Sequence, residues 1–588
     1  MLNISCFKSI YRHSEISFVI WFLLILTFMA LGATTATSAT DNSSEETVEL
    51  QIVALNDFHG QIEPPSGNVT LYYNSTHDPF KAEVGGASYL VTQIKALKAT
   101  NPNTIIVSAG DCIGASPLVS ALFHDEPTIE ALSEIGLDYS AVGNHEFDKG
   151  VLELQRMQYG CCHQVDGCQD KDRFVGAGYY YLTANVINST DGNNTANSTD
   201  STNSTLFPAY KIREIEGIPV AFIGVSLKDT PSIVAPSGIR GLEFLDEADS
   251  INAAVGELKE MGIETIIVLI HDGGKQEGLP SESKNFSGSI IDIVKRSDKE
   301  VDVFVTGHTH QAYVSTIDGR IVTQAGSQGK FLTDIDLVIS KKTGDVLLNR
   351  TRAKNVAVTR DVPEDSDTSE IVEKYSLLAT PEAQKIIGSI TADISKTQIG
   401  SGESALGDVI ADTMLNATRQ DGAKVAFMNI GGIRTDLNYK ASDSEGQGNV
   451  TYGEAFSVLP FSNSLVSMNL TGRQIDELLE RQFDNPATGR NSILQISHGF
   501  NYTWNRSAPS GQKVDINSIK INGKAIGPEA SYRIATNSFL ADGGDNFSVF
   551  KAGKDRVCGI SDLDAFIEYF KAFSPVSPGK MNRIAVMG

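Results

Sequence analysis

Five short segments of the chain carry side chains of the kinds that bind metal ions or transfer protons. Taken singly, an Asp-x-His turn or a histidine after a strand is more often a cap or a packed side chain. Together they supply carboxylates, histidines and an asparagine, which suit zinc, manganese or iron. We therefore predict a site for two divalent metal ions. The segments are Asp57-Phe58-His59, Gly110-Asp111, Gly143-Asn144-His145-Glu146-Phe147-Asp148, His271-Asp272 and Gly307-His308-Thr309-His310.

Short apolar runs precede these segments and predict the strands that position them. The runs are rich in β-branched residues, and all except 221–225 end where one of these polar segments begins. Open α/β sheets place their sites at the carboxyl ends of such strands. Helical patterns between the runs indicate helices that cover the sheets, and hence an α/β layered fold. The predicted strands are 48–55, 104–108, 221–225, 265–270 and 301–305.

Length and charge limit the classes of function. The chain has 588 residues, which is too long for one core and predicts two domains. Its formal net charge is −24, and an acidic surface repels polyanions, so we expect no nucleic-acid polymer as partner. A small anionic substrate remains compatible, because bound metal overrides the global field locally.

The first 39 residues have the pattern of a secretory signal peptide. Lys8 and Arg12 precede an apolar run over 18–33, and small residues follow. An uncleaved anchor is the alternative, although the run is short for a bilayer span of about 20 residues. With no second such run and no apolar carboxyl tail, we expect no stable membrane span after cleavage and no lipid anchor. We expect a secreted, periplasmic or cell-surface protein whose oligomeric state stays open.

The cysteines and glycosylation motifs fit export. Cys168 is expected to pair with Cys162 or Cys161, and Cys112 to be a buried thiol, while the pairing of Cys558 stays open. A zinc site built from Cys161, Cys162, His163 and Cys168 is the competing interpretation, although the spacing matches no common zinc motif. Asn-x-Ser/Thr motifs, which predict surface loops in an exported glycoprotein, include Asn68, Asn74, Asn188, Asn193, Asn197, Asn203, Asn416 and Asn501.

An acidic break at 361–369, followed by a helical stretch over 370–387, marks the boundary between the two domains. We predict domains at 48–360 and 391–588, with a helix-containing linker at 361–390. A polar tract at 187–206 is typical of a solvated loop. The second domain holds Asn429-Ile-Gly-Gly-Ile-Arg434, where two glycines allow close approach to a ligand and Arg434 offers a fork for phosphate.

The order and composition of these motifs resemble the calcineurin-like metallophosphoesterases. More narrowly, Asn56-Asp57-Phe58-His59-Gly60 and the segment 143–148 resemble the 5′-nucleotidase family, which includes UDP-sugar hydrolases, apyrases and cyclic-nucleotide phosphodiesterases. The resemblance covers nearly the whole chain after the signal. It implies a four-layer metallophosphoesterase β-sandwich with flanking helices, joined by a linker helix to a second α/β domain.

The resemblance also implies roles for the polar residues. Asp57, His59 and His310 would hold one metal ion, and His310 stands where family members often carry another polar residue. Asn144, His271 and His308 would hold the second ion, and Asp111 would bridge the two. His145 and Asp148 would form a catalytic dyad for hydrolysis of a phosphoester by activated water.

For the substrate, the resemblance points to the second domain. Residues matching Phe461 and Phe539 sandwich the base, and those matching Asn429, Arg434 and Asp545 bind nucleoside or phosphate. Family members usually carry arginine just before 403–407. Here Lys396 would take its place in binding the phosphate, as a point charge rather than a fork. Diphosphates, UDP-sugars and cyclic nucleotides therefore stay open as substrates. A nucleotide-capturing protein without activity and a sulfur-compound hydrolase are the remaining alternatives.

Overall fold

The computed structural model describes residues 46–65, 68–72, 78–189, 204–236, 238–441, 445–461, 463–486 and 489–588. The predicted signal peptide and the glycosylation motifs at Asn74, Asn193, Asn197 and Asn203 lie outside these residues. Asn188 and Asn501 lie exposed on the surface, and Asn416 is partly buried.

The amino-terminal strand β1 (Thr47–Leu55) lies in the middle of the first six-stranded sheet. It pairs in parallel with β4 (Thr104–Ser108), with Gln51 opposite Thr104, and antiparallel with β15 (Phe331–Ser340). All five residues of β4 are buried, as expected for a short β-branched run covered on both faces. The remaining strands of this sheet, whose order is β16-β15-β1-β4-β5-β6, are β5 (Tyr139–Ala141), β6 (Tyr180–Leu182) and β16 (Arg352–Ala357).

A second six-stranded sheet faces the first. Leu50 and Ile52 of β1 share one buried cluster with Ile267 and Leu269 of β11, so the two sheets pack face to face. The order of this sheet is β13-β14-β12-β11-β9-β8. Its strands are β8 (Tyr210–Ile215), β9 (Ile218–Val225), β11 (Thr265–Ile270), β12 (Val301–Thr306), β13 (Ala312–Ile317) and β14 (Arg320–Ala325). Two short pairs accompany the sandwich: β2 (Val69–Tyr72) with β3 (Pro79–Ala82), and β7 (Val186–Asn188) with β10 (Leu242–Phe244).

Helices cover the outer face of each sheet. Leu90 and Leu132 belong to one buried cluster with residues of the first sheet, and Ile251 and Val255 pack on the second. This confirms the predicted four-layer α/β arrangement. The helices are α1 (Ala87–Lys98), α2 (Leu118–Ala121), α3 (Glu126–Ile135), α4 (Val151–Tyr159), α5 (Thr230–Ile233), α6 (Glu247–Glu260) and α7 (Ile290–Arg296).

The carboxy-terminal half has its own five-stranded sheet with helices on both faces. Ala426 and Met428 of β18 face a cluster with α9 and α13, whereas Val425 and Phe427 face a cluster with α11. The sheet order is β21-β18-β25-β20-β26, and a four-stranded sheet, β24-β23-β22-β27, lies beside it. The strands are β17 (Ile386–Ser389), β18 (Val425–Met428), β19 (Asn449–Thr451), β20 (Ser464–Thr471), β21 (Gln495–Ile496), β22 (Phe500–Asn505), β23 (Lys520–Ile521), β24 (Lys524–Ala525), β25 (Ser531–Asn537), β26 (Lys554–Ser561) and β27 (Ile584–Met587). The helices are α9 (Ala405–Ala417), α10 (Tyr452–Val458), α11 (Gly472–Glu480), α12 (Ser538–Ala541) and α13 (Asp562–Phe573).

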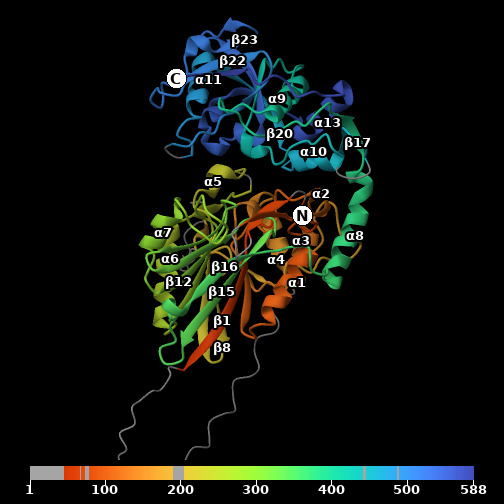
Figure 1. Ribbon diagram of the computed structural model, residues 1–588. Helices are drawn as coiled ribbons and strands as arrows, with labels where there is room; N and C mark the ends of the chain where they lie inside the picture. The colour runs from red at the N-terminus through yellow and green to blue at the C-terminus, as the bar shows by residue number, and fades with distance from the viewer. Residues whose placement is uncertain are drawn as a thin grey trace, which may run out of the picture.

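Helix α8 (Ser366–Ala383) connects the two halves and runs along the side of the first (Figure 1). It begins four residues before the predicted start at Glu370, because Asp365 caps it by accepting from the backbone N–H of Thr368. Tyr375 and Ala379 are buried in the amino-terminal core, so most of this helix is fixed on the first half rather than free. The chain then enters β17, which pairs with β19 of the second half.

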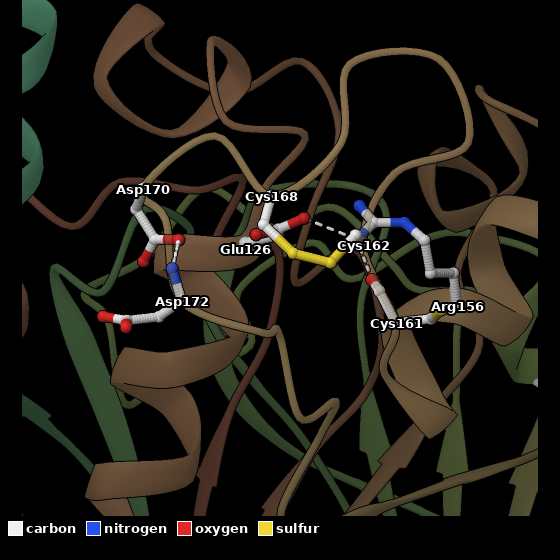
Figure 2. The surroundings of a disulfide bond; sticks show 7 residues. All are labelled: Glu126, Arg156, Cys161, Cys162, Cys168, Asp170 and Asp172. Atoms are coloured by element: carbon white, nitrogen blue, oxygen red, sulfur yellow. Dashed lines mark hydrogen bonds and ion pairs between the residues drawn. A yellow bond between two sulfur atoms is a disulfide. The ribbon is translucent and has the colours of Figure 1, made fainter.

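A disulfide joins Cys162 to Cys168 in the loop after α4 (Figure 2). This is one of the two pairings left open by the sequence. Cys161 lies outside the disulfide, which uses two of the three sulfurs of the competing zinc site. The neighbouring Arg156 pairs with Glu126 and donates to the backbone carbonyl of Cys161, which anchors the loop on α3 and α4 (Figure 2). Cys112 is a buried thiol, as predicted, and burial raises its pKa. Among the described residues, none of the helices has the length and apolar character needed to cross a bilayer.

Candidate active site

The polar segments meet at one edge of the sandwich because the strands that precede them run in parallel. Strands β1, β4 and β5 end at this edge of the first sheet, and β11 and β12 end at the same edge of the second. Seven side chains converge there from five turns: Asp57, His59, Asp111, Asn144, His271, His308 and His310.

One group of ligand atoms forms around Asp57. His310 Nε2 lies 3.4 Å from Asp57 Oδ1 and 3.0 Å from His59 Nε2. Two ring nitrogens at that distance need a proton or a cation between them. These three residues offer atoms close enough to hold one ion.

A second group forms around Asn144. His271 Nε2 and His308 Nδ1 each lie 3.1 Å from Asn144 Oδ1. Asp111 stands between the groups, with its Oδ2 3.0 Å from His271 Nε2 and 3.9 Å from His59 Nε2. This carboxylate is therefore within reach of both.

The charge balance of the cluster fits bound cations. Burial lowers the pKa of His59 to about 3 and that of His308 to about 4, so both rings keep the neutral form that binds metal. Burial would raise the pKa of Asp111, but the histidines around it, led by His271, hold that pKa well below its usual value. Burial would lower the pKa of His271, but Asp111 outweighs it and raises that pKa to about 10, so the carboxylate is balanced by a positive charge that a bound divalent cation would replace.

The backbone at these turns is unusual. Asp57, His59, Asp111, His308 and His310 all have φ between 48° and 71°, a region that non-glycine residues seldom occupy. Such conformations persist only where the surroundings enforce them, and they concentrate at functional sites. The ligand turns are therefore shaped by the fold rather than by local preference.

His145 and Asp148 lie beside this cluster on a short 3-10 turn, η2 (His145–Phe147). His145 Nδ1 is 2.7 Å from Asp148 Oδ2, which fixes the ring and leaves Nε2 as its second functional atom. Burial would lower the pKa of His145, but Asp148 and then Asp111 outweigh it and raise that pKa above 6.5. The raised pKa favours the protonated ring, and the pair is placed to deliver that proton to a bound ligand.

The predicted nucleoside residues approach His145 from the other half of the molecule. The Phe461 ring stacks on the His145 ring with centroids 5.7 Å apart and planes 13° apart, and the Arg434 guanidinium carbon lies 5.8 Å from the Phe461 centroid. Asn429 donates to Asp545, with Nδ2 2.9 Å from Oδ2. Gly544 permits the Phe539 ring to approach, since a Cβ at this glycine would lie 2.4 Å from it.

One cavity of about 380 Å³ joins the two halves. Its size suits a small organic ligand. Its wall contains the dyad, two residues of the metal cluster and five of the predicted substrate residues, namely Asn144, His145, Asp148, His308, Asn429, Arg434, Phe461, Phe539 and Asp545.

Comparison with known proteins agrees with this geometry. Residues 50–312 match the calcineurin-like phosphoesterases, and residues 386–552 match the 5′-nucleotidase carboxy-terminal domain. A cell wall protein of Listeria monocytogenes, Lmo0130, is 30% identical over 93% of this chain and 70% of its own length. The chain belongs to the 5′-nucleotidase family.

Other relatives extend this comparison. The endonuclease YhcR of Bacillus subtilis is 33% identical over 92% of this chain, which spans only 41% of that protein. A 5′-nucleotidase precursor from Thermus thermophilus has a crystal structure that aligns with a TM-score of 0.72, at 27% identity, over 92% of this chain and 99% of that one. The 5′-nucleotidase family consists of phosphoric-ester hydrolases, and its metallophosphoesterase fold implies divalent metal ions.

Lys396 does not lie where the resemblance to the 5′-nucleotidases led us to expect it, in the wall of the substrate cavity. It is not among the residues that line the cavity. Its ammonium group donates to the backbone carbonyl of Arg434 at 2.9 Å, and burial lowers its pKa. Lys396 thus supports the turn that carries Arg434, and the phosphate-binding role predicted for it is not supported by this position.

Three further residues support the centre without having been assigned a role from the sequence. Asn56 donates to Asp57 Oδ2 and accepts from the backbone of Ala325, which holds the first turn. Glu146 accepts from the backbone N–H groups of Asp111, Cys112 and Gly143 and so ties two ligand turns together. Asn537 donates to Asn429. Asn56 and Glu146 lie inside motifs quoted above, and this was the available signal for them.

Proposed function

We propose that this chain is an exported, metal-dependent 5′-nucleotidase that hydrolyses nucleotide phosphoesters to nucleoside and phosphate. The observation that carries the proposal is the cavity in which the His145–Asp148 pair faces Asn429, Arg434, Phe461 and the other predicted nucleoside residues. A ligand that fills this cavity touches the reacting groups at one end and the aromatic groups at the other.

The donor set supports two metal positions. Asp57, His59 and His310 would hold one ion, Asn144, His271 and His308 the other, and Asp111 would bridge them. When bound, two such ions supply Lewis-acid activation of water and neutralise phosphate charge. Zinc and manganese both suit imidazole and carboxylate, and we propose either as the physiological metal.

His145 would act on the phosphate from the side of the cavity. Asp148 orients its ring through Nδ1, so the proton on Nε2 can bond to a phosphoryl oxygen or to the leaving oxygen. As negative charge grows on that oxygen in the transition state, this hydrogen bond strengthens. Arg434 carries a permanent positive charge on the opposite domain and would meet the phosphate there.

The nucleoside would be held by the second domain. Phe461 and Phe539 offer faces for stacking, which every base accepts, so base selectivity should be loose. The Asn429–Asp545 pair presents hydrogen-bonding groups suited to ribose hydroxyls. In this structure Phe461 rests on His145, so a base that stacks on Phe461 must displace that contact.

Export is supported by the amino-terminal pattern and by the Listeria relative that is named a cell wall protein. We propose a secreted, periplasmic or cell-surface location, where the Cys162–Cys168 disulfide is stable.

The deciding experiment measures phosphate release by residues 40–588 with Mn²⁺, Zn²⁺ or EDTA. The substrates are AMP, ADP, ATP, UDP-glucose and 2′,3′-cyclic AMP. We expect metal-dependent release, with His145→Ala slowing kcat by about 10²–10⁴-fold. The matched control is His498→Ala, which removes an exposed histidine paired with Asp412 in the second domain. Its kcat should equal that of the wild type.

The best substrate of the panel assigns the subclass. Nucleotide binding without phosphate release under any metal would overturn the proposal in favour of a capture protein.

A further inference from the structure

A second group of metal-binding side chains lies outside the centre described above. His124 follows α2, Glu153 lies in the first turn of α4, and His163 and Asp166 belong to the loop closed by the Cys162–Cys168 disulfide. Three separate parts of the chain therefore bring these side chains together. The two histidines are about one-fifth exposed, so the group lies within reach of solvent ions.

The ligand atoms are already close. One ring nitrogen of His124, one of His163 and one carboxylate oxygen of Glu153 all lie within 4.8 Å of one another. The two imidazole rings stack with centroids 3.7 Å apart. In a tetrahedral zinc site with bonds near 2.0 Å, neighbouring ligand atoms are about 3.3 Å apart. Binding therefore requires the rings to rotate out of their stack, so that their in-plane lone pairs point at one ion.

Asp166 orients both rings. Its Oδ2 lies 2.8 Å from His124 Nε2 and 3.1 Å from His163 Nδ1. When these nitrogens donate to the carboxylate, His124 Nδ1 and His163 Nε2 keep free lone pairs. The backbone N–H of Asp166 also approaches His163 Nδ1 at 3.2 Å, and a metal on Nε2 would select the bond to the carboxylate instead. Carboxylate–histidine–metal relays of this kind are usual around protein-bound zinc.

We propose that His124, His163 and Glu153 bind a divalent transition-metal ion, with Asp166 as the residue that orients both histidines. Two imidazoles and one glutamate form a donor set that holds zinc in other proteins, and the same donors suit copper. This ion is additional to those of the catalytic centre.

The surroundings hold the site in place. Arg156 binds both oxygens of Glu153, at 2.7 and 3.0 Å, and so holds this ligand in place. The same guanidinium donates to the carbonyl of Cys161 at the base of the loop (Figure 2). A carboxylate has about four lone-pair positions, so Glu153 keeps acceptor capacity for an ion. Backbone bonds between His163 and Gly167 close the loop internally.

The site stands at the wall of the substrate cavity. His124 and Glu153 both line it. The next residue, Asp125, accepts from the backbone N–H of Gly114, whose carbonyl lies 2.9 Å from His59 Nδ1. An ion on His124 would therefore stiffen the turn that supports a ligand of the catalytic centre.

The test measures zinc bound per chain by elemental analysis of the full protein, after dialysis at a buffered free zinc concentration. We expect His124→Ala and His163→Ala each to hold one ion fewer than the wild type. His498→Ala removes an exposed histidine that also pairs with an aspartate, and it should hold as many ions as the wild type.

Crystals of the unmodified protein soaked in zinc give a second measurement that does not depend on variants folding. An anomalous peak between His124 and His163 supports the proposal. Equal zinc content in all four proteins, or a soaked crystal with peaks at the catalytic centre and none at this position, overturns it.

Discussion

Asp545 is a carboxylate in the cavity wall whose ionisation should control nucleoside binding. Desolvation raises its pKa to about 6, although the hydrogen bond from Asn429 works in the opposite direction. Above pH 6 the group is an anion that accepts from a hydroxyl, and below pH 6 it is protonated. A hydrogen bond to a charged group contributes about 1.5–3 kcal/mol, and at pH 5 about one-tenth of the groups stay ionised, so KM for AMP should rise by up to about tenfold between pH 7.5 and pH 5.

The substrate phosphate titrates in the same pH range, so the control is a substrate without ribose. The ratio of KM for AMP to KM for p-nitrophenyl phosphate removes the shared phosphate ionisation. We expect this ratio to rise on acidification in the wild type and to stay flat in Asp545→Asn. A flat ratio in the wild type would remove Asp545 from the ribose site.

At the residue scale, the sequence was enough to predict which residues form the site, but it was not enough to predict which other residues each of them contacts. The metal and dyad residues follow strand ends, and parallel strands bring their carboxyl ends to one edge, so convergence was predictable. The position of Lys396 was not predictable. Its ammonium group binds the backbone carbonyl of Arg434, 38 residues away, and only the tertiary structure brings the two together. The His124–His163 contact likewise depends on how the disulfide loop folds back.

Helix α8 is held on the amino-terminal half by Tyr375. Its ring packs against Phe123 with centroids 5.0 Å apart, and its hydroxyl lies 3.1 Å from Glu130 and 3.0 Å from Asp170. Tyr375→Phe loses the hydrogen bonds to these two carboxylates, although Asp170 keeps its bond to Lys374, and it should cost about 1.5–3 kcal/mol of unfolding free energy. Tyr375→Ala also loses the ring and should cost about 3–5 kcal/mol.

Denaturant unfolding measures both variants of Tyr375. Leu377→Ala, at a position 66% exposed on the same helix, is the control and should change stability by less than about 0.5 kcal/mol. If Tyr375→Ala lowered the unfolding free energy as little as this control does, the claim that Tyr375 fixes α8 on the amino-terminal half would be wrong.

At the element scale, buried strands were the easiest to predict, since runs such as Thr104–Ser108 are apolar throughout their middle and end where the site begins. The packing of α8 was harder. The acidic break before it indicated a linker, whereas Asp365 in that break is the helix cap and its apolar face joins the first core. Polar residues at the start of a helix indicate that this end is exposed to solvent. They do not indicate which domain the apolar face of the helix packs against.

The two halves of the molecule also meet away from α8, where α5 lies against the short 3-10 turn η6 (Gly544–Asn546). A cysteine pair introduced between these elements would lock the halves as they stand. Because substrate must enter and product must leave the cavity between them, we expect oxidation of the pair to reduce turnover strongly and reduction to restore it.

Turnover measured with and without dithiothreitol tests this lock, and the same treatment of the unmodified protein is the control. Full turnover in the quantitatively cross-linked protein would mean that the halves need not move.

Metal removal should weaken the whole fold. The centre gathers buried carboxylates and histidines from both sheets, so ions bound there stabilise the folded state by about 4 kcal/mol when present at a thousand times their dissociation constant. We expect EDTA to lower the melting temperature of the wild type. His271→Ala, which lacks the histidine nearest Asp111, should show a smaller decrease. An EDTA effect of equal size in both proteins would contradict this.

The separation of His59 and His310 along the chain has a consequence for how the protein is made. These two residues, assigned above to the first proposed metal position, stand 251 residues apart. At about 5–20 residues per second, the ribosome delivers the second of them roughly 10 to 50 s after the first. During that interval the early ligands exist without the strand that completes their surroundings. The centre can therefore form only after the ribosome has passed His310. Until then its residues are present in the growing chain but are not assembled into a site.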